Sequence, residues 1–228
     1  MIEPLAVGVH AVSTLGSFRA NQALLVFGCG PVGLLCMAVA KALGASRIIA
    51  VDVQPARLEF AKQYIPGVEV YLPKPKSQDE STIAYSARNA EDMKKTLGIE
   101  DRGAKGIDLV VDASGAEVCM QTAFYVAKVA GAVIQVGIGA FHVTIDFVMV
   151  LIKELNLKGS FRYGPGDYTL AIALVAQGKI DLKPLVTHRY PFTEALTAFK
   201  ATQAGKSEDG KGVIKAIISG PDVPVDAN

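Results

Sequence analysis

A glycine-rich turn between an apolar strand-like run and an apolar helix-like run constrains this chain more than any other feature. The turn has the sequence GCGPVG and follows the pattern GxGxxG. In such a turn the first glycine permits a tight bend, the second lets the backbone approach a pyrophosphate, and the third lets strand and helix pack closely. Because free N–H groups at a helix N-terminus favour anions, the turn predicts a dinucleotide phosphate site, with an ordinary glycine-rich turn as the alternative. The residues expected to contact the cofactor here are Gly28, Gly30, Pro31, Val32 and Gly33.

An acidic residue, Asp52, follows at the position where dinucleotide-binding chains hold a ribose. It ends the second strand-like run, about 19 residues beyond Gly33, and its carboxylate is expected to accept hydrogen bonds from the ribose hydroxyls. A 2′-phosphate in that place would set two like charges in contact, so NAD is favoured over NADP. Arg57 is either a cation that reaches a phosphate or an ordinary solvated helix residue, and the sequence leaves both interpretations open.

Short apolar runs alternate with helical patterns between residues 24 and 161. This alternation predicts an α/β fold, a doubly wound parallel six-stranded sheet with helices on both faces. The predicted strands are Leu24–Gly28, Ile48–Asp52, Val68–Leu72, Ile107–Asp112, Ala132–Gly137 and Leu155–Phe161. The predicted helices are Val32–Leu43, Pro55–Tyr64, Ile83–Leu97, Val118–Val129, Phe147–Lys153, Tyr168–Gln177 and Thr193–Ala201. Gly44 and Gly131 are interpreted as left-handed C-caps, and the polar stretch 73–105 as a surface helix with loops.

Two further strand ends are expected at the same crevice, because ligands of such sheets bind beyond the carboxyl ends of the strands. Ser114 and Gly115 follow the fourth predicted strand, and Gly137, Ile138 and Gly139 follow the fifth. Small residues there leave space for the adenosine and nicotinamide ends of a dinucleotide. Both segments are also consistent with simple strand-to-helix turns.

Charge and cysteine content exclude several classes of partner. Lysine plus arginine (23) nearly balance aspartate plus glutamate (22), so no excess positive charge is present to neutralise nucleic acid or an anionic membrane. Three widely spaced cysteines without a CxxC pair predict free thiols in a reducing compartment. With no basic leader and no apolar run of the roughly 18 residues that a membrane span needs, the expected location is cytoplasmic.

Four segments of the chain resemble the medium-chain dehydrogenase/reductase superfamily, specifically its branch of sorbitol, xylitol and L-arabinitol dehydrogenases. They are Glu3–Ala11, Gly28–Gly33, Gly159–Tyr163 and Lys183–Arg189, of which the glycine turn is the least specific. The resemblance extends from residue 2 to about residue 221, and the spacer 73–105 is similar to that of fungal members. It implies a Rossmann-type cofactor domain with remnants of a truncated zinc-containing catalytic domain.

The resemblance implies oxidation of a secondary alcohol of xylitol, sorbitol or arabinitol to the ketose, by hydride transfer to NAD. In that family a zinc ion binds the substrate hydroxyl, and its ligands come from an amino-terminal domain that precedes this sequence. His10, His142 and His188 are not paired with a cysteine at metal-ligand spacing and are interpreted as structural or surface residues. Zinc is therefore expected only in the full-length parent, and this chain alone is expected to bind NAD with little or no turnover.

The resemblance also carries over three active-site residues. Glu3 is placed beside the zinc, Arg162 near the substrate and the zinc-bound water, and Phe161 and Arg162 at the cofactor. An ion pair between Glu3 and Arg162 is a hypothesis. The alternatives are that Glu3 only favours a helix N-terminus and that Arg162 only packs at a strand end.

The same resemblance divides the chain into three parts. Residues 1–17 form a helix that links to the missing catalytic domain, 18–165 the NAD-binding domain, and 166–228 the helices and strands that normally return to the catalytic domain. The runs Leu185–Tyr190 and Val213–Ile218 are expected to lack their partners, and unpaired apolar strands promote association. A homo-oligomer, dimer or tetramer, is expected through a sheet edge near residues 142–147.

The expected small-molecule partner is a polyol or ketose, although the sequence does not choose which polyol. Two other functions stay open. One is a standalone NAD-binding or assembly module that has lost catalysis, and the other is a zinc-free reductase of the same superfamily. Zinc analysis combined with a polyol-dependent NADH assay separates the dehydrogenase from the module.

Overall fold

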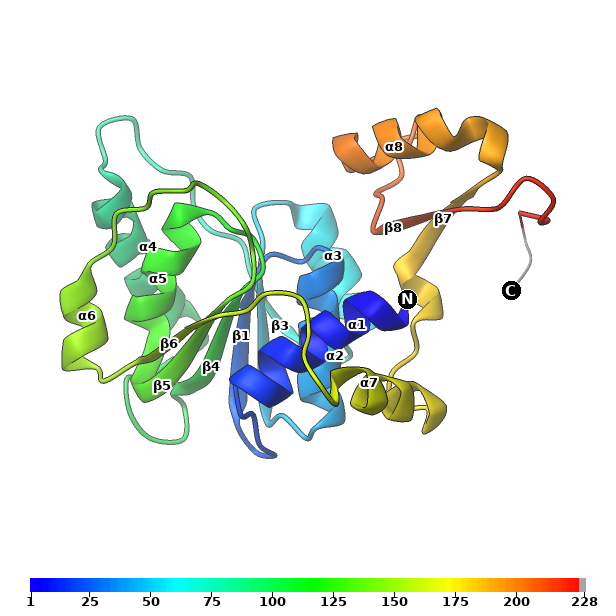
Figure 1. Ribbon diagram of the computed structural model, residues 1–228. Coiled ribbons are helices and arrows are strands. Elements are labelled where there is room, and N and C mark those ends of the chain that lie inside the picture. Colours follow the sequence, from blue (N-terminus) through cyan, green and yellow to red (C-terminus); the bar gives the residue numbers. More distant parts are fainter. Residues whose placement is uncertain (226–228) are drawn as a thin grey trace. The chain divides into compact units, whose positions relative to one another are not determined.

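The first of two compact units, Met1–Ile180, is built around a parallel sheet (Figure 1). The structure is a computed structural model and describes residues 1–225. Its strand order, β3-β2-β1-β4-β5-β6, is that of a doubly wound dinucleotide-binding sheet. The strands are β1 (Ala23–Phe27), β2 (Arg47–Val51), β3 (Glu69–Tyr71), β4 (Ile107–Asp112), β5 (Ala127–Gln135) and β6 (Asn156–Gly159). The predicted six-stranded parallel sheet is confirmed.

Helices cover both faces of this sheet, with α1 to α3 on one face and α4 and α5 on the other (Figure 1). They are α1 (Ile2–Val9), which continues as the π-helix η1 (His10–Leu15), α2 (Pro31–Ala42), α3 (Pro55–Tyr64), α4 (Thr82–Leu97), α5 (Glu117–Val126), α6 (Phe147–Ile152) and α7 (Asp167–Ala176). Because both faces are covered, β1 is buried along its whole length, which explains why its sequence is continuously apolar. None of the helices within residues 1–225 is long and apolar enough to cross a membrane.

The core beneath α4 and α5 joins these helices to the sheet. Phe27 of β1, Val110 of β4 and Val133 of β5 lie in one buried cluster with Met93 and Phe124 of the two helices. Burial of each such side chain contributes about 1.5–3 kcal/mol. The cluster therefore holds α4 and α5 against the sheet, next to the ends of β1 and β4.

The amino-terminal helix is fastened to the same unit through α2 and α7. A Cβ on Gly8 would lie 3.2 Å from the carbonyl carbon of Leu35, so glycine lets α1 cross α2 closely. In η1, His10 Nδ1 lies 2.7 Å from Oδ2 of Asp167, and the Thr14 hydroxyl donates to Oδ1 at 2.6 Å. These contacts give His10 a structural role.

Asp167 is buried and also accepts a hydrogen bond from the Gly164 N–H, at 2.6 Å. Burial raises the pKa of its carboxyl group, but the hydrogen bonds from Thr14, Gly164 and His10 outweigh burial and hold the pKa below its ordinary value. The carboxylate thereby connects η1, α7 and the segment that leads from β6 to α7.

The end of α5 differs from the sequence prediction. The helix predicted to run to Val129 ends at Val126, and β5 begins at the next residue. Gly131, predicted as the left-handed C-cap of this helix, lies inside β5, where Ala130 has the positive φ of 60° instead. The prediction of Gly44 as a left-handed residue after α2 is confirmed by its φ of 88°.

A lysine takes the place of the expected glycine cap. The buried Nζ of Lys153 donates to the carbonyl oxygens of Tyr125 and Ala127, at 2.7 and 2.8 Å. It also contacts Asp101 at 2.7 Å, so its charge is paired. A cation satisfies the last carbonyls of a helix. Because Lys153 lies far in sequence from the end of α5, no local sequence pattern predicts this cap.

The second unit, Asp181–Asn228, contains two strands that pair with one another. β7 (Val186–Tyr190) and β8 (Lys215–Ile218) are parallel, and η2 (Lys183–Leu185), η3 (Phe192–Glu194) and α8 (Ala195–Ala204) precede or connect them. The expectation that these two runs lack partners is wrong, because the crossover through α8 brings them into register.

The boundary between the units lies at Ile180, after α7. The sequence-based boundary at residue 165 would place α7 in the C-terminal part instead. Residues 226–228, the end of the predicted range 166–228, lie outside the described residues.

Candidate dinucleotide-binding site

The glycine turn leads from β1 into α2, and each of its glycines meets a different requirement. Gly28 has a φ of 91°, a conformation that other residues rarely adopt. A Cβ on Gly33 would lie 1.8 Å from the carbonyl oxygen of Gly28, so only glycine lets α2 begin so close to β1. A Cβ on Gly30 would meet no atom within 4 Å. Gly30 therefore borders open space rather than protein.

That open space lies at the N-terminus of α2. Gly30 is the N-cap and supplies no side chain, and Pro31 stands at the first helical position. Pro31 has no N–H, but the N–H groups of Val32 and Gly33 have no acceptor within the helix. An anion placed there accepts hydrogen bonds from the backbone and gains about 0.3–1 kcal/mol from the helix dipole.

Asp52 lies directly after β2 and is 7% exposed. Its Oδ2 accepts a hydrogen bond from the Cys29 N–H and its Oδ1 from the Gln54 N–H, both at 2.8 Å. The carboxylate therefore ties the end of β2 to the glycine turn. Because a carboxylate oxygen accepts about two hydrogen bonds, each oxygen retains capacity for a ligand hydroxyl. Arg57 Nη1 is 3.9 Å from Oδ2 and balances part of this charge.

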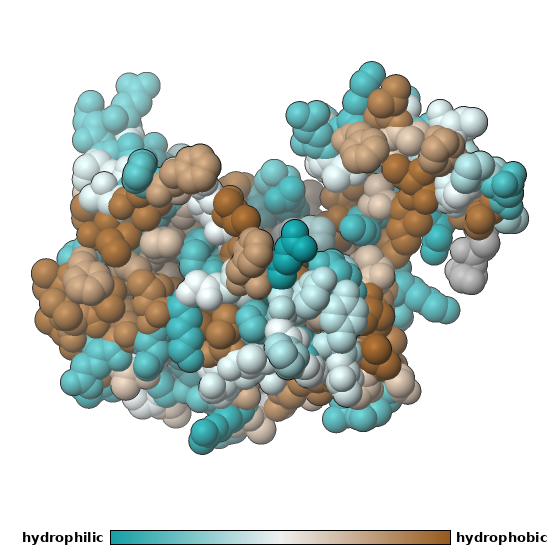
Figure 2. Space-filling view, in the orientation of Figure 1, coloured by the Kyte–Doolittle hydropathy of each residue, from teal (hydrophilic) through white to brown (hydrophobic). Residues whose placement is uncertain are grey.

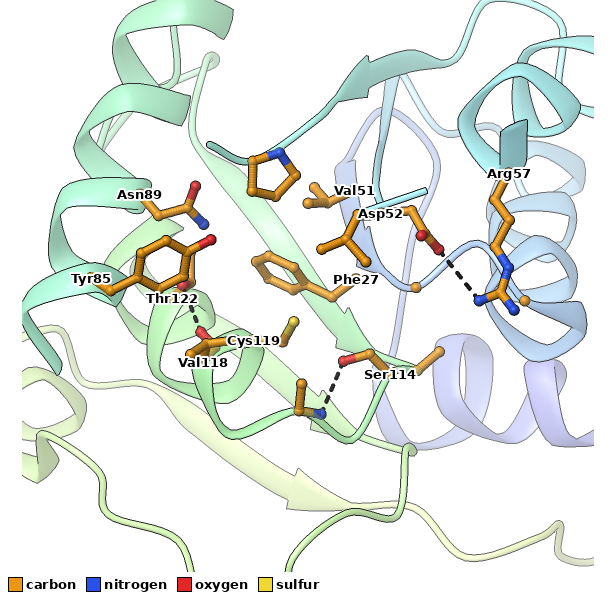
Figure 3. Close-up of a pocket in the computed structure, with 16 residues that line it drawn as sticks. Phe27, Val51, Asp52, Arg57, Tyr85, Asn89, Ser114, Val118, Cys119 and Thr122 are labelled. Carbon is orange, nitrogen blue, oxygen red and sulfur yellow. Dashed lines mark hydrogen bonds and ion pairs between the residues drawn. The ribbon is translucent and has the colours of Figure 1, made fainter. Parts of the chain in front are cut away.

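A pocket of about 260 Å³, which we call the Asp52 pocket, opens beyond the carboxyl ends of β1, β2 and β4 (Figure 3). It lies where β1 is flanked by β2 on one side and β4 on the other, the switch point at which such sheets bind ligands. Its volume is below the roughly 300–1,000 Å³ of pockets that hold a whole drug-sized ligand, so it suits one end of a dinucleotide. Apolar lining side chains are Phe27, Val51, Val53, Pro73, Ala113, Ala116, Val118 and Cys119, and polar ones are Asp52, Arg57, Tyr85, Asn89, Ser114 and Thr122.

Tyr85 and Asn89 are among the lining residues that were not predicted from the sequence. They belong to α4, which was interpreted only as a surface helix. The buried residues of α4 are Tyr85, Ser86, Asn89, Ala90 and Met93. Their spacing of three or four residues is that of one helix face. The helical spacing of the buried positions was therefore visible in the sequence, but the polar residues Ser86 and Asn89 among these five obscured it.

The turn after β4 is shaped by a buried carboxylate. Oδ1 of Asp112 accepts hydrogen bonds from the Ser114 N–H at 2.8 Å and from the Ser114 hydroxyl at 2.7 Å. The Gly115 N–H donates to the same oxygen at 3.2 Å. These contacts hold Ser114 at the edge of the Asp52 pocket.

The glycines after β4 and β5 are required by contact between two loops. A Cβ on Gly137 would lie 2.2 Å from the Gly115 nitrogen, and one on Gly139 would lie 1.8 Å from the Gly115 oxygen. Beside these loops is a second hollow of about 580 Å³, which we call the Phe161 pocket. Ile138 and Phe161 line it and are 85% and 73% exposed, so the hollow is apolar and open.

The structure does not join Glu3 to Arg162. Within residues 1–225 no ion pair involves either residue. Glu3 lies exposed in the first turn of α1, where an acid favours the helix N-terminus. Arg162 has a φ of 57°, and its guanidinium carbon lies 5.5 Å from the centre of the Phe161 ring. The contact with the neighbouring ring takes the place of the hypothetical ion pair.

The three cysteines, Cys29, Cys36 and Cys119, are free, and burial raises the pKa of each thiol to about 12. None is a thiolate at neutral pH. In the described part of the chain no group of three His, Cys, Asp or Glu side chains is arranged to hold a metal ion. These residues do not fit the zinc ion that the family resemblance implies, and no zinc step is assigned to them.

Known proteins are similar to this chain in sequence and in fold. A family profile described as "Zinc-binding dehydrogenase" matches residues 31–177. The chain is 42% identical over 222 residues to "Probable D-xylulose reductase A" of Arthroderma otae, covering 97% of this chain and 57% of that protein. The chain therefore spans just over half the length of the curated relatives that it matches.

Solved structures of two bacterial dehydrogenases have the same fold. The 2R,3R-butanediol dehydrogenase of Bacillus subtilis superposes with a TM-score of 0.77 at 25% identity, covering 95% of this chain and 56% of that one. An alcohol dehydrogenase of Escherichia coli CFT073, solved with NADH, also gives 0.77, at 22% identity, covering 95% and 57%. The resemblance seen in the sequence is confirmed. Because the family profile covers more than half of its residues, the chain belongs to the zinc-binding dehydrogenase family.

Proposed function

We propose that this chain binds NAD in the crevice formed by the glycine turn and the Asp52 pocket. The observation that carries the proposal is the buried Asp52 carboxylate, hydrogen-bonded to the glycine turn at the switch point of the sheet. In this arrangement the pyrophosphate takes the open space at Gly30, and the adenosine takes the Asp52 pocket. Backbone N–H groups of α2 bind the phosphates, and Asp52 accepts the ribose hydroxyls.

The charge at Asp52 supports NAD over NADP. A 2′-phosphate would stand next to the carboxylate of Asp52, which is 7% exposed, so water would screen the two like charges poorly. Arg57 is the nearest cation, but at 3.9 Å it already balances Asp52 itself. One positive charge does not offset both a carboxylate and a phosphate.

We assign the nicotinamide end to the Phe161 pocket. When bound there, NAD supplies the acceptor for a hydride. Ile138 and Phe161 offer an apolar surface against which one face of the ring packs, while the hollow itself stays open. Arg162 follows directly and is proposed to lie near the substrate, with Glu3 as the second active-site residue from this chain.

In the parent protein we propose oxidation of a secondary alcohol of xylitol, sorbitol or arabinitol to the ketose. The relatives named D-xylulose reductase favour the pair of xylitol and D-xylulose among these. Zinc would be held outside the residues described here, so the chain alone is proposed to bind NAD with little or no turnover. Its free thiols support a reducing, cytoplasmic location.

Calorimetric titration of the purified chain with NAD and NADP tests the cofactor assignment. Saturable binding of NAD, at least about tenfold tighter than that of NADP, is the expected result. A well-folded chain that binds neither dinucleotide contradicts the proposal. A xylitol-dependent NADH assay with added Zn²⁺ tests the second part, and rapid turnover with stoichiometric zinc would overturn the assignment of inactivity.

We further propose that the chain forms a homo-oligomer through the β6 edge of its sheet, because the segment 142–147, where the edge was expected, holds no strand. All four residues of β6 are exposed, and the neighbouring α6 exposes Phe147, Val148, Leu151 and Ile152. Figure 2 shows apolar side chains gathered over α6. Open strand edges and apolar patches both promote pairing with a second copy. A monodisperse monomer in sedimentation velocity at micromolar concentration would contradict this assignment.

A further inference from the structure

We propose that Asn89 is a specificity-determining residue, which reads the adenine base of the cofactor by donating a hydrogen bond to ring nitrogen N1. This inference rests on the proposed binding of NAD and concerns the inner end of the same pocket. Nothing in the glycine turn or at Asp52 distinguishes adenine from another purine, because those groups contact phosphate and ribose. Discrimination of the base needs a polar group at its edge.

Asn89 is a buried residue whose amide oxygen is hydrogen-bonded and whose amide nitrogen is not. The residue is 5% exposed and lines the Asp52 pocket. Its Oδ1 accepts a hydrogen bond from the Tyr71 hydroxyl at 3.3 Å, which orients the amide. Its Nδ2 has no hydrogen-bond partner in the described part of the chain. Nδ2 is not among the buried side-chain atoms that lack a partner, so it is open to the pocket, where it is free to donate to a ligand acceptor.

The position of Asn89 selects which edge of the base it meets. Figure 3 shows Asn89 and Asp52 on opposite sides of the pocket. Adenine is joined to its ribose through N9, and the N1 and N6 edge is the one farthest from that bond. A nucleoside whose ribose contacts Asp52 therefore presents this edge toward Asn89. N1 of adenine is an acceptor and Nδ2 of Asn89 is a donor, so the two are complementary.

Side-chain contacts position the helix that carries Asn89. The Ser86 hydroxyl donates to Oε1 of Gln121 in α5 at 2.8 Å, and the Tyr85 hydroxyl donates to the carbonyl oxygen of Lys74 at 3.1 Å. Arg88 lies 5.2 Å from the centre of the Tyr85 ring and covers it. A fixed donor rejects a mismatched base because the buried groups would be left unpaired.

Hypoxanthine provides the opposite chemistry at the same place. It carries N1–H where adenine has a lone pair, so two donors would face each other beside Asn89. A carboxylate at position 89 would instead accept from N1–H and would still accept from Tyr71. The polarity of one side chain therefore sets the preferred base.

The test is calorimetric titration of the full chain with NAD and with nicotinamide hypoxanthine dinucleotide. Wild type, Asn89→Asp and a matched control, Asp92→Asn, are compared. Asp92 lies on the same helix but contacts Lys74 at 3.0 Å and does not line the pocket. We expect wild type to prefer NAD by about tenfold, the scale of one hydrogen bond. Asn89→Asp is expected to lose about tenfold in NAD affinity and to bind the hypoxanthine analogue at least as well as NAD, while Asp92→Asn keeps the wild-type preference.

A second variant separates loss of base recognition from unfolding caused by a buried carboxylate. Asn89→Leu is neutral and of similar volume, and it is expected to weaken NAD binding and to bind both dinucleotides equally, with folding checked by circular dichroism. Equal binding of both dinucleotides by wild type, or an unchanged preference in the Asn89 variants, overturns the role of Asn89 while NAD binding stands. Failure of wild type to bind NAD contradicts the proposed function itself.

Discussion

The Asp52 pocket and the Phe161 pocket lie at the carboxyl ends of the same sheet, yet they differ in how completely they are built. The first is closed by α4 and α5 and contains a buried carboxylate whose oxygens are positioned by backbone N–H groups. The second is larger and open, and its apolar lining residues Ile138 and Phe161 face solvent. Polar groups of fixed geometry mark the first pocket, and exposed apolar surface marks the second.

The difference teaches which half of the site this chain completes by itself. In the proposed arrangement, the groups that would contact phosphate, ribose and base all come from β1, β2, α2 and α4 or the turns that follow them. Large exposed apolar side chains, in contrast, indicate a surface that functions against another surface. We infer that the adenosine end binds fully in this chain, whereas the nicotinamide end needs a second protein surface over the Phe161 pocket.

Substitution at Gly33 should have the largest effect. Gly33→Ala places a Cβ 1.8 Å from the Gly28 oxygen, so the turn must move or α2 must shift. We expect a loss of about 3 kcal/mol in the free energy of unfolding, measured by urea denaturation, and loss of NAD binding. Gly30→Ala is the matched control, because its Cβ meets no protein atom. It should fold like wild type but bind NAD weakly, and normal NAD binding by Gly30→Ala would show that the phosphates lie elsewhere.

Removal of the carboxylate at Asp52 should come next. Asp52→Ala is expected to weaken NAD binding about 30-fold, because hydrogen bonds to a charged group contribute about 1.5–3 kcal/mol. NADP should lose much less, since the like charge near its 2′-phosphate disappears as well. Calorimetric titration of wild type and Asp52→Ala with NAD and NADP gives the ratio of the two losses in affinity. Equal losses for NAD and NADP would remove Asp52 from its assigned contact with the ribose.

The cluster around Asp167 supports the segment between the Phe161 pocket and α7, and its charge predicts a pH dependence. Because the folded-state pKa lies below the ordinary value, its ionised form stabilises the protein at pH above about 4, and this stability is lost as pH falls through the folded pKa. Asp167→Asn should therefore cost about 1–2 kcal/mol at pH 7. In thermal denaturation the difference in melting temperature between wild type and Asp167→Asn should shrink as the pH falls from 5 toward 2. A difference that grows in acid would contradict stabilisation by the ionised carboxylate.

The smallest effect is expected at the open pocket. If the nicotinamide end is incomplete in this chain, ADP-ribose and NAD should bind with affinities within about threefold, and Phe161→Ala should change NAD affinity by no more than about twofold. Calorimetry with both ligands measures this directly. A large advantage of NAD over ADP-ribose that Phe161→Ala abolishes would show that the Phe161 pocket is complete without a second surface.

Sequence patterns predicted the parts of the molecule that local chemistry controls. The six strands, the turn into α2 and the left-handed Gly44 follow from apolar runs and glycine conformations that are visible within about ten residues. Long-range contacts decided the rest. The C-terminal end of α5 depends on Lys153, and the pairing of β7 with β8 depends on a crossover, and neither contact has a local signature.

For the candidate site, the sequence by itself determined the backbone requirements, because positive φ at Gly28 and the absence of a Cβ at Gly33 are properties of single residue types. It also fixed Asp52 at a strand end, since parallel strands carry their carboxyl ends to one edge. Only the tertiary structure decided that α4 forms the inner wall of the Asp52 pocket and that Glu3 and Arg162 do not pair. The physical reason is that a side chain acquires its partners from segments far away in sequence, and their packing follows from burial of the whole core rather than from any local pattern.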